Sequence, residues 1–558
     1  MRALKLAAGA LTLAVLLTAC GPAAGPAPTQ VPTPSVAPTH TPMTDEAVFA
    51  GLMAEVEAHN RGIDAPSGDL ERFKYDFEEG GPLLTAKEWE ERYLRAPEQS
   101  PAVLSREDAG AEADYLFRLL RTYYGLYTWF GGDEAFGAAE EEVLAGLEGR
   151  EEIPLEEYRG LLLQSLDFIN DGHFVLGASR LVKRLTLFCD ESLLFERRDG
   201  GVYLEGRRLA AVDGGDPAEY LKRAVGPEGE LTWKLYVPGP DDTSRSAVLA
   251  FSDGTETVEL PRVKDTDYSI GKGSGPFLME ERNGRLYIQM DRMAFSPEDG
   301  VSQALLIPGD EKAKADFIAS AETAMGYSTA VVNLVRNPGG NGDLPIQWFR
   351  ALTGAEPEPN YCTLGLDSFG WGARGGEEQE GIYRVRRPEP QYLEREDGPF
   401  LIVLTSGATA SAGEGFTDLT RNLSRTLVVG SNTGGCLTGS QTWFDERLPW
   451  SGLKLAWGMD LFYWPADYFR EGVGLEPDVY LTGMDQGRRL VQFLDRYLPE
   501  DKPRRRWECR RHAPAKNVRG QMSPDVFSGG GRTGVILRAR GLPARGGAEI
   551  HSPCGRAS

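Results

Sequence analysis

The chain has 558 residues, enough for two or three domains with a sizeable core. Its 41% hydrophobic and 26% charged residues are typical of a soluble globular protein. The net charge of −23 argues against nucleic acid as a partner, and six cysteines are too few for a disulfide scaffold.

Residues 1–20 have the pattern of an export signal. Arg2 and Lys5 precede an apolar run, Leu6 to Leu17, that is too short to cross a bilayer as a helix. The run ends in Leu17-Thr18-Ala19-Cys20, which resembles the lipobox of bacterial lipoproteins. This resemblance implies cleavage before Cys20 and lipidation of its thiol. The protein would then be anchored at the cell membrane on the extracytoplasmic face. The alternative is an ordinary signal peptide that is cleaved nearby.

The segments 21–43 and 501–558 differ in composition from the chain between them. Residues 21–43 contain seven prolines and no charge, which predicts a spacer between membrane and folded protein. From residue 503 onward, twelve Lys or Arg face three Asp or Glu, without apolar periodicity. We predict a basic, disordered tail, and a basic interaction tail is the alternative.

Residues 44–180 show helical periodicity. Ser105, with Asp108 three residues later, predicts the start of one helix. Pro154 is a favoured first-turn residue and predicts the start of another. That second helix is expected to end in the turn Asn170–His173.

Residues 181–275 contain short apolar runs, such as Gly201–Leu204 and Leu231–Tyr236, separated by Gly, Pro and Asp turns. They predict a small β-rich segment. Its stretch from Arg207 to Val225 weakly resembles part of a PDZ domain.

Strands and helices alternate over residues 276–500, which predicts an α/β domain. Buried strands are expected at 330–335, 400–404 and 426–429.

Ser411 lies between the predicted strand 400–404 and the apolar face of a helix marked by Phe416 and Leu419. A helix N-terminus offers free N–H groups and a positive dipole end, which stabilise an oxyanion. The small neighbours in Thr409–Glu414 leave room for a substrate carbonyl. This is the logic of a nucleophile elbow, and a plain helix N-cap serine is the alternative.

A second loop, Arg336–Gly342, follows the predicted strand 330–335. Its glycines let backbone N–H groups face a ligand, as an oxyanion hole requires. A tight turn is the alternative. We assign the oxyanion hole to the N–H groups of Gly339 and Ala412.

The motifs Leu334–Gly340, Ser411–Glu414 and Val428–Gly435 occur in an order that resembles the tail-specific, or C-terminal-processing, peptidase family S41. The resemblance implies a ClpP/crotonase-like β-β-α core in the 276–500 domain. It also implies that Ser411 is the nucleophile and that the substrate is a peptide or protein.

The best-known branch of this family uses a Ser-Lys dyad, but its lysine position is Cys436 here. We interpret Cys436 as lining the site. The tricorn-like branch carries an Asp-Gly-His or Ser-His element, which resembles the sequence around His173 and implies that His173 is the base. Glu471, in Glu471–Asp478, matches that branch's glutamate, which would orient the histidine through a serine or water. The serine beside the histidine in that branch is Gly172 here.

The sequence therefore predicts an extracytoplasmic, lipid-anchored serine peptidase with Ser411, His173 and Glu471 as catalytic residues. No metal or organic cofactor is expected, because no His, Cys or Asp cluster has ligand spacing. One alternative is a non-catalytic protein on the same fold that binds peptides or hydrophobic ligands. Another is an esterase or other acyl-transfer enzyme. An unshifted histidine base would titrate near pH 6.5.

Overall fold

The computed structural model describes residues 44–64, 66–93, 96–97, 99–269, 276–294, 311–367 and 377–499. Cys20, the export signal, the spacer and the basic tail lie outside these residues. Within the described part, no helix has both the length and the apolar character to cross a membrane. The same residues contain no group of three or more His, Cys, Asp or Glu side chains arranged to hold a metal ion.

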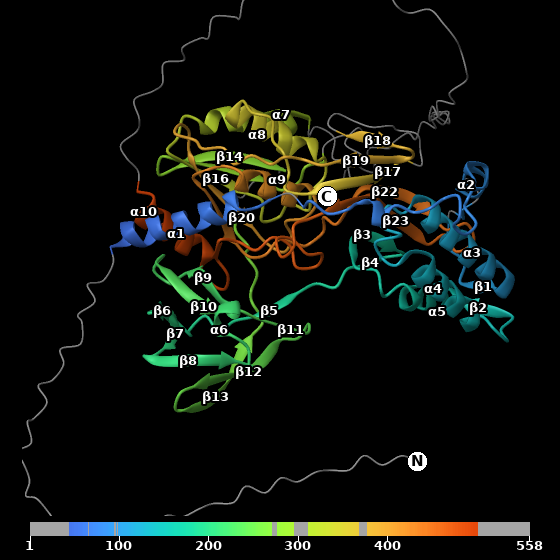
Figure 1. Cartoon of the computed structure of the whole chain (residues 1–558), viewed down its shortest axis with the longest axis horizontal. Coiled ribbons are helices and arrows are strands. Elements are labelled where there is room, and N and C mark those ends of the chain that lie inside the picture. Colours follow the sequence, from blue (N-terminus) through green and yellow to red (C-terminus); the bar gives the residue numbers. More distant parts are fainter. Residues whose placement is uncertain are drawn as a thin grey trace, which may run out of the picture. The chain divides into compact units, whose positions relative to one another are not determined.

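The helices in the described part, labelled in Figure 1, are α1 Asp45–Arg61, α2 Ala86–Tyr93, α3 Arg106–Tyr123, α4 Gly132–Gly146, α5 Leu155–Ser165, α6 Pro217–Tyr220, α7 Glu311–Ala324, α8 Asp343–Thr353, α9 Ala412–Arg421 and α10 Gln486–Tyr497, with a 3-10 turn at Glu71–Phe73. The strands before residue 270 are β1 Val103–Ser105, β2 Glu152–Pro154, β3 Asp171–Leu176, β4 Ser179–Leu181, β5 Thr186–Phe188, β6 Phe195–Arg198, β7 Gly201–Leu204, β8 Arg207–Val212, β9 Leu221–Val225, β10 Leu231–Leu235, β11 Val237–Gly239, β12 Ser244–Phe251 and β13 Gly254–Pro261. The later strands are β14 Phe277–Arg282, β15 Arg285–Met290, β16 Thr329–Asn333, β17 Cys362–Leu366, β18 Glu378–Glu380, β19 Tyr383–Arg386, β20 Phe400–Thr405, β21 Thr426–Gly430, β22 Gly439–Arg447, β23 Lys454–Tyr463 and β24 Val479–Tyr480.

The core of the α/β domain is a run of parallel strands, β15-β16-β20-β21-β24. Both faces of these strands are covered, so the inner residues of β16, β20 and β21 are continuously apolar rather than alternating. On β16, Val332 packs in a cluster with the helices α7, α8 and α9 through Phe317, Trp348 and Phe416. The next residue toward the N-terminus, Val331, points to the opposite face and packs with α1 and α10. The predicted α/β class and the three predicted buried strands are confirmed.

Part of the helical region contributes to a second sheet, in the order β18-β19-β17-β23-β3-β4. The prediction that a helix ends at Asn170–His173 is wrong, because α5 ends at Ser165 and Asp171 begins β3. This strand forms because Val175 and Leu176 pair with Ala456 and Leu455 of β23, about 280 residues later. Such a distant pairing is invisible to local periodicity. The predicted helix starts at Ser105 and Pro154 are confirmed.

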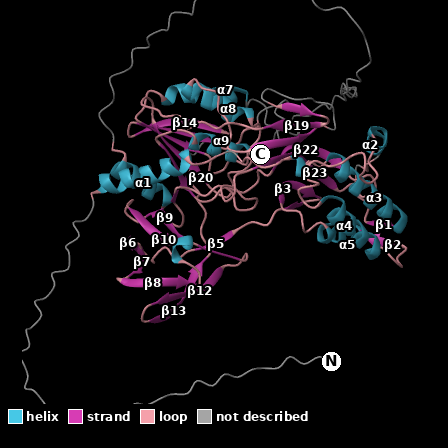
Figure 2. Ribbon diagram, in the orientation of Figure 1, coloured by secondary structure: helices cyan, strands magenta, loops and turns pink. Residues whose placement is uncertain are grey.

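The described residues of the segment 181–269 contain the strands β5 to β13 and the short helix α6, and strands are its main regular structure, as Figure 2 shows. It continues the central sheet, because Ala224 of β9 pairs with Tyr480 of β24. In the described part of the chain, the full order is β13-β12-β8-β7-β6-β10-β9-β24-β21-β20-β16-β15-β14. The β-rich segment is therefore hydrogen-bonded to the α/β domain rather than simply tethered to it.

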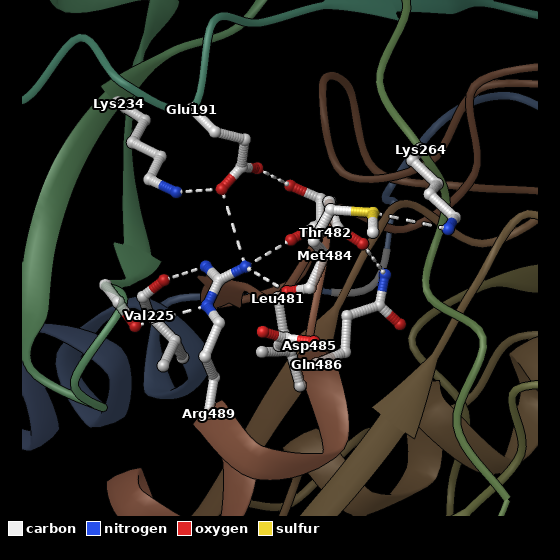
Figure 3. A network of polar contacts seen from close by, with 12 residues as sticks. Glu191, Val225, Lys234, Lys264, Leu481, Thr482, Met484, Asp485, Gln486 and Arg489 are labelled. Carbon is white, nitrogen blue, oxygen red and sulfur yellow. Dashed lines mark hydrogen bonds and ion pairs between the residues drawn. The ribbon is translucent and has the colours of Figure 1, made fainter.

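A partly buried polar network strengthens this junction (Figure 3). Glu191, in the loop between β5 and β6, pairs with Lys234 of β10 and lies 3.4 Å from the Arg489 guanidinium of α10. Lys234 is 1% exposed and Arg489 is 4% exposed. Arg489 also donates to the Thr482 carbonyl at 2.6 Å, and the Thr482 hydroxyl donates to Glu191 at 2.9 Å. Because the two buried cations share one carboxylate, Glu191 is the central residue of the network.

Candidate active site

Ser411 lies at the junction between the loop after β20 and the start of α9. Its backbone has φ 52° and ψ −120°, a conformation that is costly for a residue with a side chain. An ordinary N-cap serine looks different: Ser105 has φ −66° and ψ 155°, and its hydroxyl accepts from Asp108 N at 3.1 Å. The Ser411 hydroxyl instead contacts His173, with 3.2 Å between Oγ and Nε2. The geometry is therefore that of a strained elbow and not that of a plain helix cap.

The strained turn at Ser411 is held by Glu414, a fully buried carboxylate in the first turn of α9. Its Oε2 accepts from the backbone N–H groups of Ser411 and Cys436, each at 2.9 Å. Its Oε1 accepts from Gly435 N at 2.8 Å and from the Thr433 hydroxyl at 2.6 Å. Glu414 thus joins the elbow to the loop 433–436. Sequence reasoning gave Glu414 no role, although a glutamate three residues after the elbow serine is a recognisable signal.

His173 lies on β3 and is 7% exposed. Its backbone N–H donates to Asp171 Oδ1 at 2.8 Å, and the other oxygen of Asp171 accepts from the Tyr124 hydroxyl at 2.9 Å. The pKa of His173 is lowered to about 4, mainly by burial and also by the charge of Arg180, although a hydrogen bond with the Gly439 backbone opposes this shift. The imidazole is therefore neutral at pH 7 and can accept a proton at Nε2.

Glu471 acts on the backbone around the histidine. Its carboxylate accepts from Gly172 N at 2.7 Å, from Thr438 N at 2.8 Å and from Leu437 N at 3.2 Å. Burial raises the pKa of Glu471, and the nearby carboxyl of Asp171 raises it further. These contacts bind the strand that carries His173 to the segment after Cys436. Glu471 therefore lies one step removed from the imidazole, as a residue that fixes the backbone around it.

The two predicted oxyanion donors, Ala412 and Gly339, differ in the hydrogen bonding of their backbone N–H groups. Ala412 is the first residue of α9, so its N–H belongs to a turn that has no acceptor within the helix. The assignment of Gly339 is corrected, because its N–H donates to Asn337 Oδ1 at 2.8 Å. The Gly339 carbonyl and the Asn341 N–H both bond to Met293 in an isolated β-bridge, and this pairing directs the N–H of Gly340 away from Met293. Gly340 is therefore an alternative candidate in this loop. Gly339 remains close to the elbow, since a Cβ on it would lie 2.7 Å from the Ser411 Cβ.

Cys436 lies against the imidazole, with its Sγ 3.7 Å from Nδ1 and 4.0 Å from Nε2 of His173. The side chain is buried, and burial raises the pKa of its thiol well above the usual value. A thiol that stays protonated at neutral pH is a poor nucleophile. The structure thus places Cys436 in the lining of the site, beside the base.

We compared the chain with protein-family models, curated proteins and solved structures. Residues 286–481 match the model of peptidase family S41, a segment that contains Ser411 and Glu471 but not His173. No curated protein matches the sequence significantly. Among solved structures, mature CPAF shares 14% identity over 70% of this chain and 95% of its own, with a TM-score of 0.37. The photosystem II D1 C-terminal processing protease shares 16% identity over 70% and 98%, with a TM-score of 0.33. A lipoprotein from Streptococcus agalactiae shares 11% identity over 69% and 96%, also with a TM-score of 0.33. The chain therefore contains a peptidase family S41 domain at residues 286–481.

Proposed function

We propose that this protein is a serine peptidase in which Ser411 is the nucleophile and His173 the general base. The observation that carries the proposal is the 3.2 Å separation of Ser411 Oγ and His173 Nε2 at a strained strand-to-helix turn. A serine hydroxyl needs such a base, because it is a weak nucleophile at its ordinary pKa. The low pKa of His173 means that the ring is neutral before the reaction starts.

In the proposed reaction, Ser411 Oγ attacks the carbonyl carbon of the scissile peptide bond while its proton passes to His173 Nε2. The N–H groups of Ala412 and Gly340 are the candidate donors to the resulting oxyanion. The intermediate collapses, the C–N bond breaks, and the proton on His173 goes to the leaving amine. Water then attacks the acyl ester on Ser411 and gives its proton to His173. Release of the carboxylic acid returns that proton to Ser411.

Peptides or proteins outside the cytoplasm are the proposed substrates. The S41 domain supports a peptide substrate. The lipobox-like Leu17–Cys20 and the proline-rich spacer support export and attachment to a membrane through a lipid on Cys20. A membrane-attached peptidase of this kind would act on polypeptides that reach the extracytoplasmic face.

The test is hydrolysis of an unfolded protein labelled with a quenched fluorophore, together with mass spectrometry of the new termini. Wild-type protein should release fluorescence, and Ser411→Ala should not. Ser105→Ala is the matched control, because Ser105 caps a helix start in the same chain and should leave turnover intact. Activity that survives in Ser411→Ala would rule out the proposed nucleophile.

A further inference from the structure

Cys436 and Gly172 meet beside the His173 ring. The structure leaves no room for both to carry a full side chain, since a Cβ on Gly172 would lie 2.5 Å from Cys436 Sγ and 2.9 Å from its Cβ. It would also lie 3.1 Å from Glu471 Oε1. Gly172 lies within the strand β3, and its φ is not positive. Glycine is therefore needed here for space and not for backbone conformation, and the sulfur occupies that space.

Two buried carboxylates, those of Glu414 and Glu471, hold the backbone segment that carries Cys436. Glu414 Oε2 accepts from Cys436 N, while Glu471 Oε2 accepts from Leu437 N and Thr438 N. Glu471 also accepts from Gly172 N through its Oε1. The thiol and the histidine are consequently held by one connected set of hydrogen bonds. An accidental contact between two loosely held side chains would lack this double support.

We propose that Cys436 is a positioning residue for His173, whose sulfur sets the rotation of the imidazole so that Nε2 faces Ser411. The inference rests on the proposed peptidase function. The distances from Cys436 Sγ to Nδ1 and to Nε2 of His173 differ by only 0.3 Å, so the sulfur packs beside the ring and is not in line with one N–H bond. A ring that rotated away from Ser411 would have to displace this sulfur, which the loop cannot easily allow.

The neutral, weakly polar thiol also keeps water away from the ring. The charged groups that act on His173 or on the adjacent Cys436 are Asp171 on β3, Arg180 on β4, Glu414 on α9 and Glu471 in the loop before β24. Burial is the main reason for the low pKa of His173. Removal of the sulfur would open space for water and weaken this effect. The contact therefore has two measurable consequences, one on turnover and one on the titration of the base.

The test uses the full chain and compares Cys436→Ala with Cys362→Ala, since Cys362 is an equally buried free cysteine on β17. Cys436→Ala should lower kcat about threefold to tenfold, the range of one modest polar contact, with little change in KM. The acidic limb of its pH–kcat profile should move upward, toward the ordinary histidine pKa. Cys362→Ala should lower the thermal midpoint similarly but change neither property. Cys436→Ser, which keeps a small polar atom at the position, should recover part of the loss.

Gly172→Ala provides an independent test through steric coupling. Alone, its methyl group would collide with the sulfur, so kcat should fall further than in Cys436→Ala. The double variant Gly172→Ala/Cys436→Ala should be more active than Gly172→Ala, because the 2.5 Å contact is gone. Wild-type kcat and an unmoved acidic limb in folded Cys436→Ala would overturn the positioning role, as would strictly additive losses in the double variant. A wild-type protein with no peptidase activity would instead overturn the proposed function.

Discussion

His173 Nε2 and Ser411 Oγ lie 3.2 Å apart, although the two residues are 238 positions apart in the sequence. The strand β3 brings the histidine to the site by pairing with β23, which follows Ser411 in the chain. The elbow at the start of α9 presents the serine from the other side. The site therefore depends on the joining of the N-terminal region to the S41 domain, and neither part carries both groups.

His173→Ala should reduce turnover about as much as Ser411→Ala, because base and nucleophile act as one unit. General-base assistance is typically worth about 10²–10⁴-fold, and the double variant should be no worse than either single one. Steady-state kinetics with a fluorogenic peptide would measure this. His59→Ala, on α1, is the matched control and should retain activity. Near-normal turnover in a folded His173→Ala variant would remove histidine from the mechanism.

The acidic limb of kcat should lie near pH 4, well below the value of about 6.5 expected of an unshifted histidine. The pKa of His173 shifts downward because burial disfavours the charged ring. The neutral base is therefore fully present above pH 6.5 and is lost as the pH falls through about 4. Arg180→Gln should move the limb upward, because the arginine charge also lowers the pKa of His173. A pH–rate profile of both proteins measures this. A limb near pH 6.5 in the wild type would show that the ring is solvated.

The amino-acid sequence predicted the parts of the site that depend on local signals. The apolar run of β20, the turn and the helix face of α9 are contiguous, so the position of Ser411 followed from them. The strand β3 and the engaged N–H of Gly339 could not be predicted, because they depend on a distant strand and on the Asn337 side chain. The spatial role of Glu414 was missed for a similar reason, since three of its four donors come from residues 433–436.

Glu414→Gln should weaken both folding and catalysis. Four donors converge on the carboxylate, and an amide has only one oxygen to receive them, so buried N–H groups would lose their acceptor. Each unsatisfied buried group costs about 1–3 kcal/mol. Chemical denaturation would measure the free energy of unfolding, with Glu322→Gln on α7 as a helix control. Equal stabilities in the two variants would mean that Glu414 does not support the elbow.

Glu191→Ala should destabilise the junction of the β-rich segment, because Lys234 and Arg489 would remain buried without their shared carboxylate. Because the Glu191 side chain is itself 36% exposed, the loss should be smaller than the about 3–5 kcal/mol that breaking a fully buried pair costs. Glu196→Ala removes an exposed partner of Arg198 and should cost about 1 kcal/mol or less. Denaturant unfolding of the two variants gives the comparison. A loss in Glu191→Ala no larger than in Glu196→Ala would show that the network contributes little.

Cys20→Ala should release the protein from membranes or block its processing. The lipobox-like sequence and the charge-free spacer motivate this expectation. Fractionation of expressing cells, followed by detection of the protein in soluble and membrane fractions, measures the outcome. An unchanged membrane fraction in the variant would contradict lipid anchoring through Cys20.

Covalent labelling of the serine tests the central claim most directly. A fluorophosphonate should modify wild-type protein at one site, and mass spectrometry of the digested protein should locate that site at Ser411. Labelling should vanish in Ser411→Ala and should be about 10²-fold slower or more in His173→Ala, since the base must take the proton during attack. A folded wild-type protein that stays unlabelled, or that is labelled equally fast with and without His173, would contradict the Ser411–His173 mechanism.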